Sequence, residues 1–299
     1  MGSRVWAGPT VLFAGVSEAS AILGFEDDYL RATRPLERMA KLRRTRPVDA
    51  AEYRRYLSEQ ALEWSDAERA RYAPVAERLE RFLEKLRPRM PARILLIKAG
   101  DVMDGVPHTR INAIVLPQAF LAKAGQEELL YVMAHELSHL LSRYDDQARD
   151  KLYAAIGFRR CERVELPAEV ERLRVTNPDA PADRHAIRVR YRGRKVEAMP
   201  VSMLRSATLE PGQGFLANWH APWLLVERRD GSCRATGQRA EPHELEALYE
   251  QIGRNTDYLV HPEEIVADNF ALLALESLTG RQAPLPSPAV AERIRRLVF

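Results

Sequence analysis

The sequence has little of several features that mark specialised classes of protein. Only 2 of its 299 residues are cysteines, Cys161 and Cys233, which excludes a disulfide-rich scaffold and leaves the two free or paired with each other. No apolar run approaches the ~18 residues that a membrane-spanning helix needs. Internal repeats and low-complexity segments are absent as well. These absences exclude a helical membrane protein, a repeat array and a fibrous chain.

Charge of one sign is also scarce. Lys and Arg number 45 against 42 Asp and Glu, a net charge of +3, so we expect no nucleic-acid partner. Hydrophobic residues make up 46% and charged residues 29% of the chain. This balance predicts a globular protein of one large domain or two modest ones, with a substantial core.

The first 21 residues have one Arg and a short apolar stretch, a weak likeness to a signal peptide. Glu18 stands where a cleavage region would lie, so we expect this segment to belong to the folded chain. Met1-Gly2-Ser3 is typical of residues added for expression, a pattern compatible with a removed export signal. Both an exported and a cytoplasmic location are therefore considered.

The hydrophobic pattern predicts an α+β protein. Residues 1–90 are expected to be mainly helical, with Ser65 and Glu68 forming a capping box at the start of one helix. Residues 93–97 and 111–116 are expected to be strands, and 126–142 a helix. Between 160 and 254 the pattern becomes β-rich, with a hairpin predicted over 185–201, and helices return after 255.

The main chemical signature is His135-Glu136-Leu137-Ser138-His139, an H-E-x-x-H motif inside the predicted helix. Histidines four residues apart lie on one helix face, so both imidazoles can bind one metal ion. Zn²⁺ suits imidazole, and Glu136 is placed to take a proton from a zinc-activated water. We therefore expect one zinc ion per chain.

A third ligand must come from elsewhere in the chain. Glu264 is followed four residues later by Asp268, so Glu264 can bind the metal while Asp268 accepts a hydrogen bond from a ligand histidine. Glu263 is the rival ligand, but it has no Asp four residues on.

These residues resemble the gluzincin metallopeptidases, in particular the soluble relatives of the CAAX prenyl endopeptidases and the bacterial membrane heat-shock endopeptidase. Three segments are similar to family motifs: the strand Asn112–Pro117, the helix Glu127–His139, and Glu264–Asp268. Residues 287–294 are similar to a fourth motif of the family, but less closely. The family's glycine pair after the strand is absent, since Gln118 and Ala119 stand there, and about 125 residues separate His139 from Glu264.

The resemblance implies a mainly helical zincin-like core with a small edge-strand sheet. It divides the chain into an N-terminal helical region (1–90), a core with the zinc helix (91–159), a β-rich insertion (160–254) and a C-terminal helical part that supplies the third ligand (255–299). It also implies that Asn112, Ala113 and Ile114 bind a peptide or protein substrate by β-addition. Export is slightly favoured over the cytoplasm.

The implied activity is that of a soluble zinc endopeptidase with Glu136 as general base. An additional donor should stabilise the oxyanion; Arg293 and Tyr258 are preferred over His261 and His220. Two alternatives are a zinc-binding module without proteolysis and a hydrolase of a non-peptide bond. The insertion is also expected to cover the active site and lower its activity.

Overall fold

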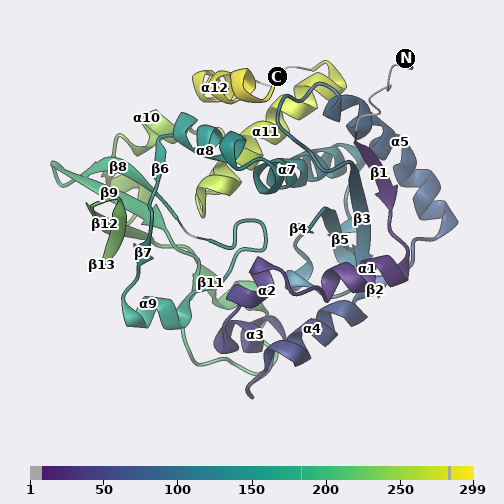
Figure 1. Cartoon of the computed structure of the whole chain (residues 1–299), viewed down its shortest axis with the longest axis horizontal. Coiled ribbons are helices and arrows are strands. Elements are labelled where there is room, and N and C mark those ends of the chain that lie inside the picture. The colour runs from purple at the N-terminus through teal and green to yellow at the C-terminus, as the bar shows by residue number, and fades with distance from the viewer. Residues whose placement is uncertain (1–8, 183, 282–283) are drawn as a thin grey trace, which may run out of the picture.

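The computed structural model describes residues 9–182, 184–281 and 284–299. Its two larger sheets lie on opposite sides of the view, and helices α7, α8 and α11 lie across the top between them (Figure 1). Met1–Ser3 lie outside the described residues. The helices are α1 (Val16–Leu23), α2 (Asp28–Ala32), α3 (Pro35–Lys41), α4 (Ala50–Glu59), α5 (Asp66–Leu83), α6 (Gln118–Leu121), α7 (Gln126–Tyr144), α8 (Asp146–Ala155), α9 (Ala168–Leu173), α10 (Leu248–Ile252), α11 (Pro262–Thr279) and α12 (Pro288–Val298). This mixture confirms the α+β class.

The strands fall into a five-stranded sheet, a seven-stranded sheet and a short pair. The first sheet has the order β1-β3-β5-β4, with β2 paired to β3. Its strands are β1 (Thr10–Phe13), β2 (Ala61–Leu62), β3 (Arg93–Ala99), β4 (His108–Arg110) and β5 (Ala113–Pro117). The others are β6 (Phe158–Arg160), β7 (Val164–Glu165), β8 (His185–Tyr191), β9 (Arg194–Pro200), β10 (Met203–Leu204), β11 (Trp219–His220), β12 (Trp223–Arg229), β13 (Ser232–Ala240) and β14 (Leu245–Glu246).

Helices cover both faces of the five-stranded sheet. Ile94 and Leu96 of β3 belong to the main core with α5 and α7, whereas Leu95 and Ile97 pack with α1 and α4. This explains why β3 is apolar at consecutive positions, since a strand buried on both faces needs no polar alternation. The N-terminal 90 residues supply two strands of the sheet, β1 and β2, besides the expected helices. The capping box of Ser65 and Glu68 at the start of α5 is confirmed.

The seven-stranded sheet is formed by the region expected to be β-rich, together with β6. The predicted hairpin is present as β8 and β9. One face of this sheet, with Ile187 and Trp223, joins the main core beneath α8, α11 and α12. The opposite face forms its own cluster with Val170 of α9. The sheet therefore shares a core with the rest of the chain.

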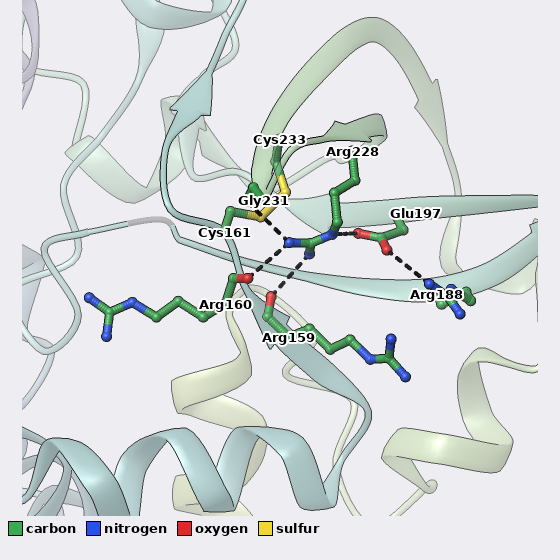
Figure 2. Close-up of a disulfide and its surroundings, with 8 residues drawn as sticks. All are labelled: Arg159, Arg160, Cys161, Arg188, Glu197, Arg228, Gly231 and Cys233. Atoms are coloured by element: carbon green, nitrogen blue, oxygen red, sulfur yellow. Dashed lines mark hydrogen bonds and ion pairs between the residues drawn. A yellow bond between two sulfur atoms is a disulfide. The ribbon is translucent and has the colours of Figure 1, made fainter.

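Cys161 and Cys233 form a disulfide that links the chain before β7 to β13 (Figure 2). Beside it, the Arg228 guanidinium donates to Glu197 over 2.8 Å and to the backbone oxygen of Arg160 over 2.9 Å. Because the two linked positions are 72 residues apart, the disulfide closes a long loop around much of the sheet.

Candidate metal centre

The regular geometry of a helix brings the H-E-x-x-H residues to the face of α7 that packs on α11. His139 is 1% exposed and Glu136 is 3% exposed, while His135 lies at the edge of a cavity. The facing helix α11 begins at Pro262, with His261 as its N-cap residue. Acidic residues in its first turn suit the helix dipole, and this turn supplies Glu263 and Glu264.

The two imidazoles meet at one carboxylate oxygen of α11. His135 Nε2 lies 3.1 Å from Glu264 Oε2, and His139 Nε2 lies 3.6 Å from the same atom. The other oxygen of Glu264 accepts a hydrogen bond of 2.7 Å from the Asn177 amide. Two imidazole nitrogens and a carboxylate oxygen thus face a common point, as a tetrahedral metal site requires.

The far nitrogen of each histidine is bound to a second carboxylate. His135 Nδ1 lies 2.9 Å from Asp268, and His139 Nδ1 lies 2.8 Å from Glu263. A carboxylate at Nδ1 favours the tautomer in which the Nε2 lone pair is free to bind a metal. The juxtaposition of Asp268 with a histidine is as expected, whereas Glu263, considered a rival ligand, contacts the outer nitrogen of His139 instead.

Hydroxyl groups hold these two carboxylates in turn. Tyr131 donates to Asp268 over 2.8 Å, and Thr256 donates to its other oxygen. Tyr153 from α8 donates to Glu263. These donors were missed in the sequence because they come from three separate segments, and no local spacing connects them.

The electrostatics of the centre favour a cation. Burial opposes ionisation of Glu264, but His139 and His135 hold its pKa down at about 2. Burial alone would lower the pKa of His139, but the charges of Asp179 and Glu264 raise it to about 9. The negative groups thus stabilise positive charge where the side chains meet.

Glu136 is buried beside this point. Burial, followed by the charge of Asp179, raises its pKa to about 8. Its Oε2 atom has no hydrogen-bond partner among the described residues. A buried carboxylate oxygen without a partner is costly, so this atom needs a group that the protein does not supply. The residues present therefore fit a zinc ion with an associated water.

Of the expected oxyanion donors, the structure brings only Tyr258 to the cavity that contains His135 and Glu136. Although 41% of Tyr258 is exposed, partial burial, followed by the charges of Glu264 and Asp179, raises its pKa, so its hydroxyl stays protonated. The placement of Arg293 in the site was wrong: it donates to the carbonyls of Ala155 and Gln251, both over 2.7 Å. These bonds hold it at the ends of α8 and α10.

His261 and His220 are also outside the cavity. The Nδ1 atom of His261 accepts the amide hydrogen of Glu263 over 3.0 Å, as an N-cap side chain does. His220 lies on β11, which pairs with β10. Neither is among the residues that line the cavity.

The expected substrate strand is not an edge strand. Ala113 and Ile114 lie in β5, which pairs with β3 on one side and β4 on the other, so its backbone has no free edge. Asn112 belongs with Ile111 to the turn between β4 and β5, and its amide donates to the Arg93 carbonyl. The edge strand is β4 instead.

The error has a local cause. Ile111 adopts a positive φ of 53° at the turn, a conformation that β-branched residues rarely adopt. The sequence therefore carries no turn signal there, and the turn reads as the start of the strand. In the structure, Arg143 of α7 donates to the carbonyl of Ile111 over 3.0 Å and helps to hold this turn.

The cavity beside the centre has a volume of about 260 Å³. One side is formed by apolar residues of distant regions: Val106, Pro107, Val132, Phe215, Leu216 and Trp219. The segment Val175–Asp179, from the β-rich region, forms another side. Within it Asp179 has a carboxylate oxygen that lies with ligand atoms of His139 and Glu264, all within 4.8 Å of one another. No functional role is assigned to this segment from the sequence.

No family model, curated protein or solved structure matches the chain. In the described part of the chain, no helix combines the length and the apolar character that crossing a bilayer demands. What the site can do is therefore argued from the arrangement of its own side chains.

Proposed function

We propose that the chain is a zinc-dependent endopeptidase with a zincin-like core, related to the gluzincin metallopeptidases. One observation carries the proposal: the Nε2 atoms of His135 and His139 both face Glu264, while each Nδ1 atom is bound to a carboxylate. Two ordinary helical histidines do not need such a pair of oriented partners. His135, His139 and Glu264 would hold the zinc, with Asp268 and Glu263 orienting the rings.

When bound, zinc would polarise the substrate carbonyl and lower the pKa of a water towards ~7. The pKa of Glu136, which burial and Asp179 raise, would fall beside the charge of a bound cation. Glu136, buried with an unpartnered oxygen, would then take a proton from that water and pass it to the departing amine. The protonated hydroxyl of Tyr258, a residue that lines the same cavity, would donate a hydrogen bond to the developing oxyanion. Of the two oxyanion donors that we prefer on the basis of the sequence, the proposal therefore keeps Tyr258 and omits Arg293.

The proposed substrate is an extended peptide, and the proposed contact is β-addition to β4. Strand β4 is a terminal strand of the five-stranded sheet, paired on one side with β5, and His108 at its start lines the cavity. The disulfide is typical of chains that fold in an oxidising compartment, which agrees with the exported location that the resemblance favours.

Metal analysis tests this proposal. The purified protein should bind one zinc ion, and Glu264→Ala should lose most of it; Glu128→Ala, an exposed position of α7, is the matched control. Glu136→Gln should keep the metal and cleave peptides about 10²- to 10⁴-fold more slowly, the usual contribution of a general base. Absence of zinc in every variant, even after zinc is added back, would refute the proposal. Tight zinc binding without cleavage in any variant would favour the binding module.

A further inference from the structure

The segment Val175–Asp179, hereafter the strap, crosses the candidate metal centre and is fixed along its whole length. The Val175 amide donates to the Ser202 carbonyl over 2.8 Å, and Arg143 donates to the Pro178 carbonyl over 3.1 Å. At its second residue, the Thr176 amide donates to Glu37 over 3.0 Å, and the Thr176 hydroxyl lies within hydrogen-bond distance of both Glu37 and the Ala32 carbonyl. The strap is therefore an ordered element and not a loose loop.

The anchor at Thr176 is built from buried charge. Glu37 and Lys41 form an ion pair of 2.6 Å whose side chains are 0% and 2% exposed. Lys41 also donates to the Thr176 carbonyl over 3.3 Å. Buried ion pairs are costly unless their remaining lone pairs are used, and Thr176 uses them here. This arrangement ties the strap to α3, far from the metal-binding residues along the chain.

The strap separates two cavities. On one side lies the 260 Å³ cavity with His135 and Glu136, and on the other lies a cleft of about 790 Å³ that includes Arg143 and Arg149. Pro178 and Asp179 line both. Displacement of the strap would join the two cavities into one groove that passes the metal-binding residues. An extended peptide needs such a groove, whereas the smaller cavity alone holds only a few side chains.

Asp179 occupies two positions that a peptidase needs free. Its Oδ1 atom accepts the amide hydrogen of Thr109 over 2.7 Å and the Thr109 hydroxyl over 2.5 Å. Thr109 is the middle residue of β4, so Asp179 takes the outward amide that would bind a substrate backbone. One oxygen of the same carboxylate and the ligand atoms of His139 and Glu264 all lie within 4.8 Å of one another, close enough to bind one metal ion together.

We infer that this chain holds its metal centre closed, with Asp179 as a fourth protein ligand kept in place by the strap. The inference rests on the proposed function and adds its regulation. Working zinc peptidases leave one position for water, whereas four protein ligands are typical of closed sites. Asp179 of the strap already occupies the outward amide of β4 and would fill the fourth position on a bound zinc, so an extended peptide would enter only after the strap moves.

The test compares Asp179→Asn with Asp230→Asn, the same change at an exposed turn between β12 and β13. The amide oxygen of the substituted side chain would still accept from Thr109, so the change isolates the carboxylate's contact with the metal. Zinc affinity, measured by competition with a chelator, should fall about tenfold or more in Asp179→Asn only. The visible spectrum of the Co²⁺-loaded protein should change in that variant as well, because one ligand is replaced.

Cleavage of dye-quenched casein gives the second measurement. Asp179→Asn should cleave about tenfold faster than the wild type, or more, because the amide binds the metal more weakly than the carboxylate and leaves the fourth position to water. Thr176→Val removes the hydroxyl contact with Glu37 while leaving all metal-facing side chains, and it should also cleave faster.

Three results would count against these ideas, and they are distinguishable. Unchanged zinc affinity and Co²⁺ spectrum in Asp179→Asn would overturn the inference and leave the proposed peptidase intact. Lower affinity without faster cleavage in either variant would also overturn it, since Asp179 would then belong to the working site. A wild type that binds no metal would refute the proposed function itself.

Discussion

The α7–α11 helix pair and the seven-stranded sheet use different means to stay ordered. In the helix pair, half-buried His135 and buried His139 are held by carboxylates, which are themselves held by tyrosine and threonine hydroxyls. In the sheet, a covalent disulfide and an apolar cluster hold the strands, and the charged Arg228 serves to bind backbone oxygens (Figure 2).

The difference suggests a division of tasks. Buried polar networks are favourable only when every member has a partner. Among the described residues, Glu136 Oε2 has no hydrogen-bond partner, and the same holds for the hydroxyls of Ser138 and Ser142 on α7 and the ring nitrogens of His185 in the sheet. Of these four residues, Glu136 is the one that lines the cavity with His135 and His139. We infer that chemistry belongs to the helix pair, and that the sheet provides a rigid base from which the strap reaches the site. Three predictions test whether the two regions are independent in this way.

The largest effect is expected from the disulfide. Replacing Cys161 and Cys233 by Ser should lower the free energy of unfolding by about 4 kcal/mol, because the bond restricts a 72-residue loop in the unfolded chain. Urea unfolding measures the change, and a reductant should affect the wild type but not the double variant. Zinc affinity of the folded variant should stay the same. A parallel loss of zinc affinity would show that the sheet also sets the metal geometry.

A smaller effect is expected at the helix pair. Asp268→Asn keeps the shape of the side chain but weakens its acceptance of the His135 Nδ1 hydrogen. Zinc affinity should fall about 10- to 100-fold, the usual result when the partner of a ligand histidine is changed. The exposed Asp257→Asn is the matched control. Wild-type affinity in Asp268→Asn would mean that the ring of His135 is oriented by packing alone.

The smallest effect concerns the junction of the two regions. The Tyr153 ring contacts His185 of β8 and His261 before α11, with centroids 4.6 Å and 6.2 Å away. Burial lowers the pKa of His261 to about 3. The unfolded histidine binds a proton near its ordinary pKa of about 6.5 and the folded one only near pH 3, so stability falls as the pH drops through this range.

Between about pH 7 and pH 5.5 this histidine should remove about 1 kcal/mol from the free energy of unfolding. His261→Asn keeps an N-cap acceptor for α11 and should lose that part of the acid sensitivity. Urea unfolding at the two pH values measures it, with the exposed His243→Asn as control. Equal acid sensitivity in all three proteins would contradict a buried neutral His261.

Features that depend on neighbours along the chain could be predicted from the sequence. The capping box at Ser65 and the i, i+4 placement of His135 and His139 follow from helix geometry alone. The i, i+4 spacing of Glu264 and Asp268, which places both on one face of α11, follows from the same helix geometry. The hairpin of β8 and β9 is equally local, because alternation and a glycine turn specify it.

Features that join distant segments could not be predicted in this way. Strand β4 was not predicted because the turn that follows it places Ile111 at a positive φ, which β-branched residues rarely adopt. Arg293 was placed in the site by a weak motif, but in the structure the carbonyls at the ends of α8 and α10 bind its guanidinium.

The sequence by itself determined which residues can bind a metal and on which helix face they lie, because a helix fixes spacing over a few residues. Only the tertiary structure decided that Glu263 orients His139, that Tyr258 faces the cavity, and that Asp179 reaches the same point from the β-rich region. Contacts between segments that are far apart in the sequence depend on how the helices and sheets pack, and no local pattern encodes that packing.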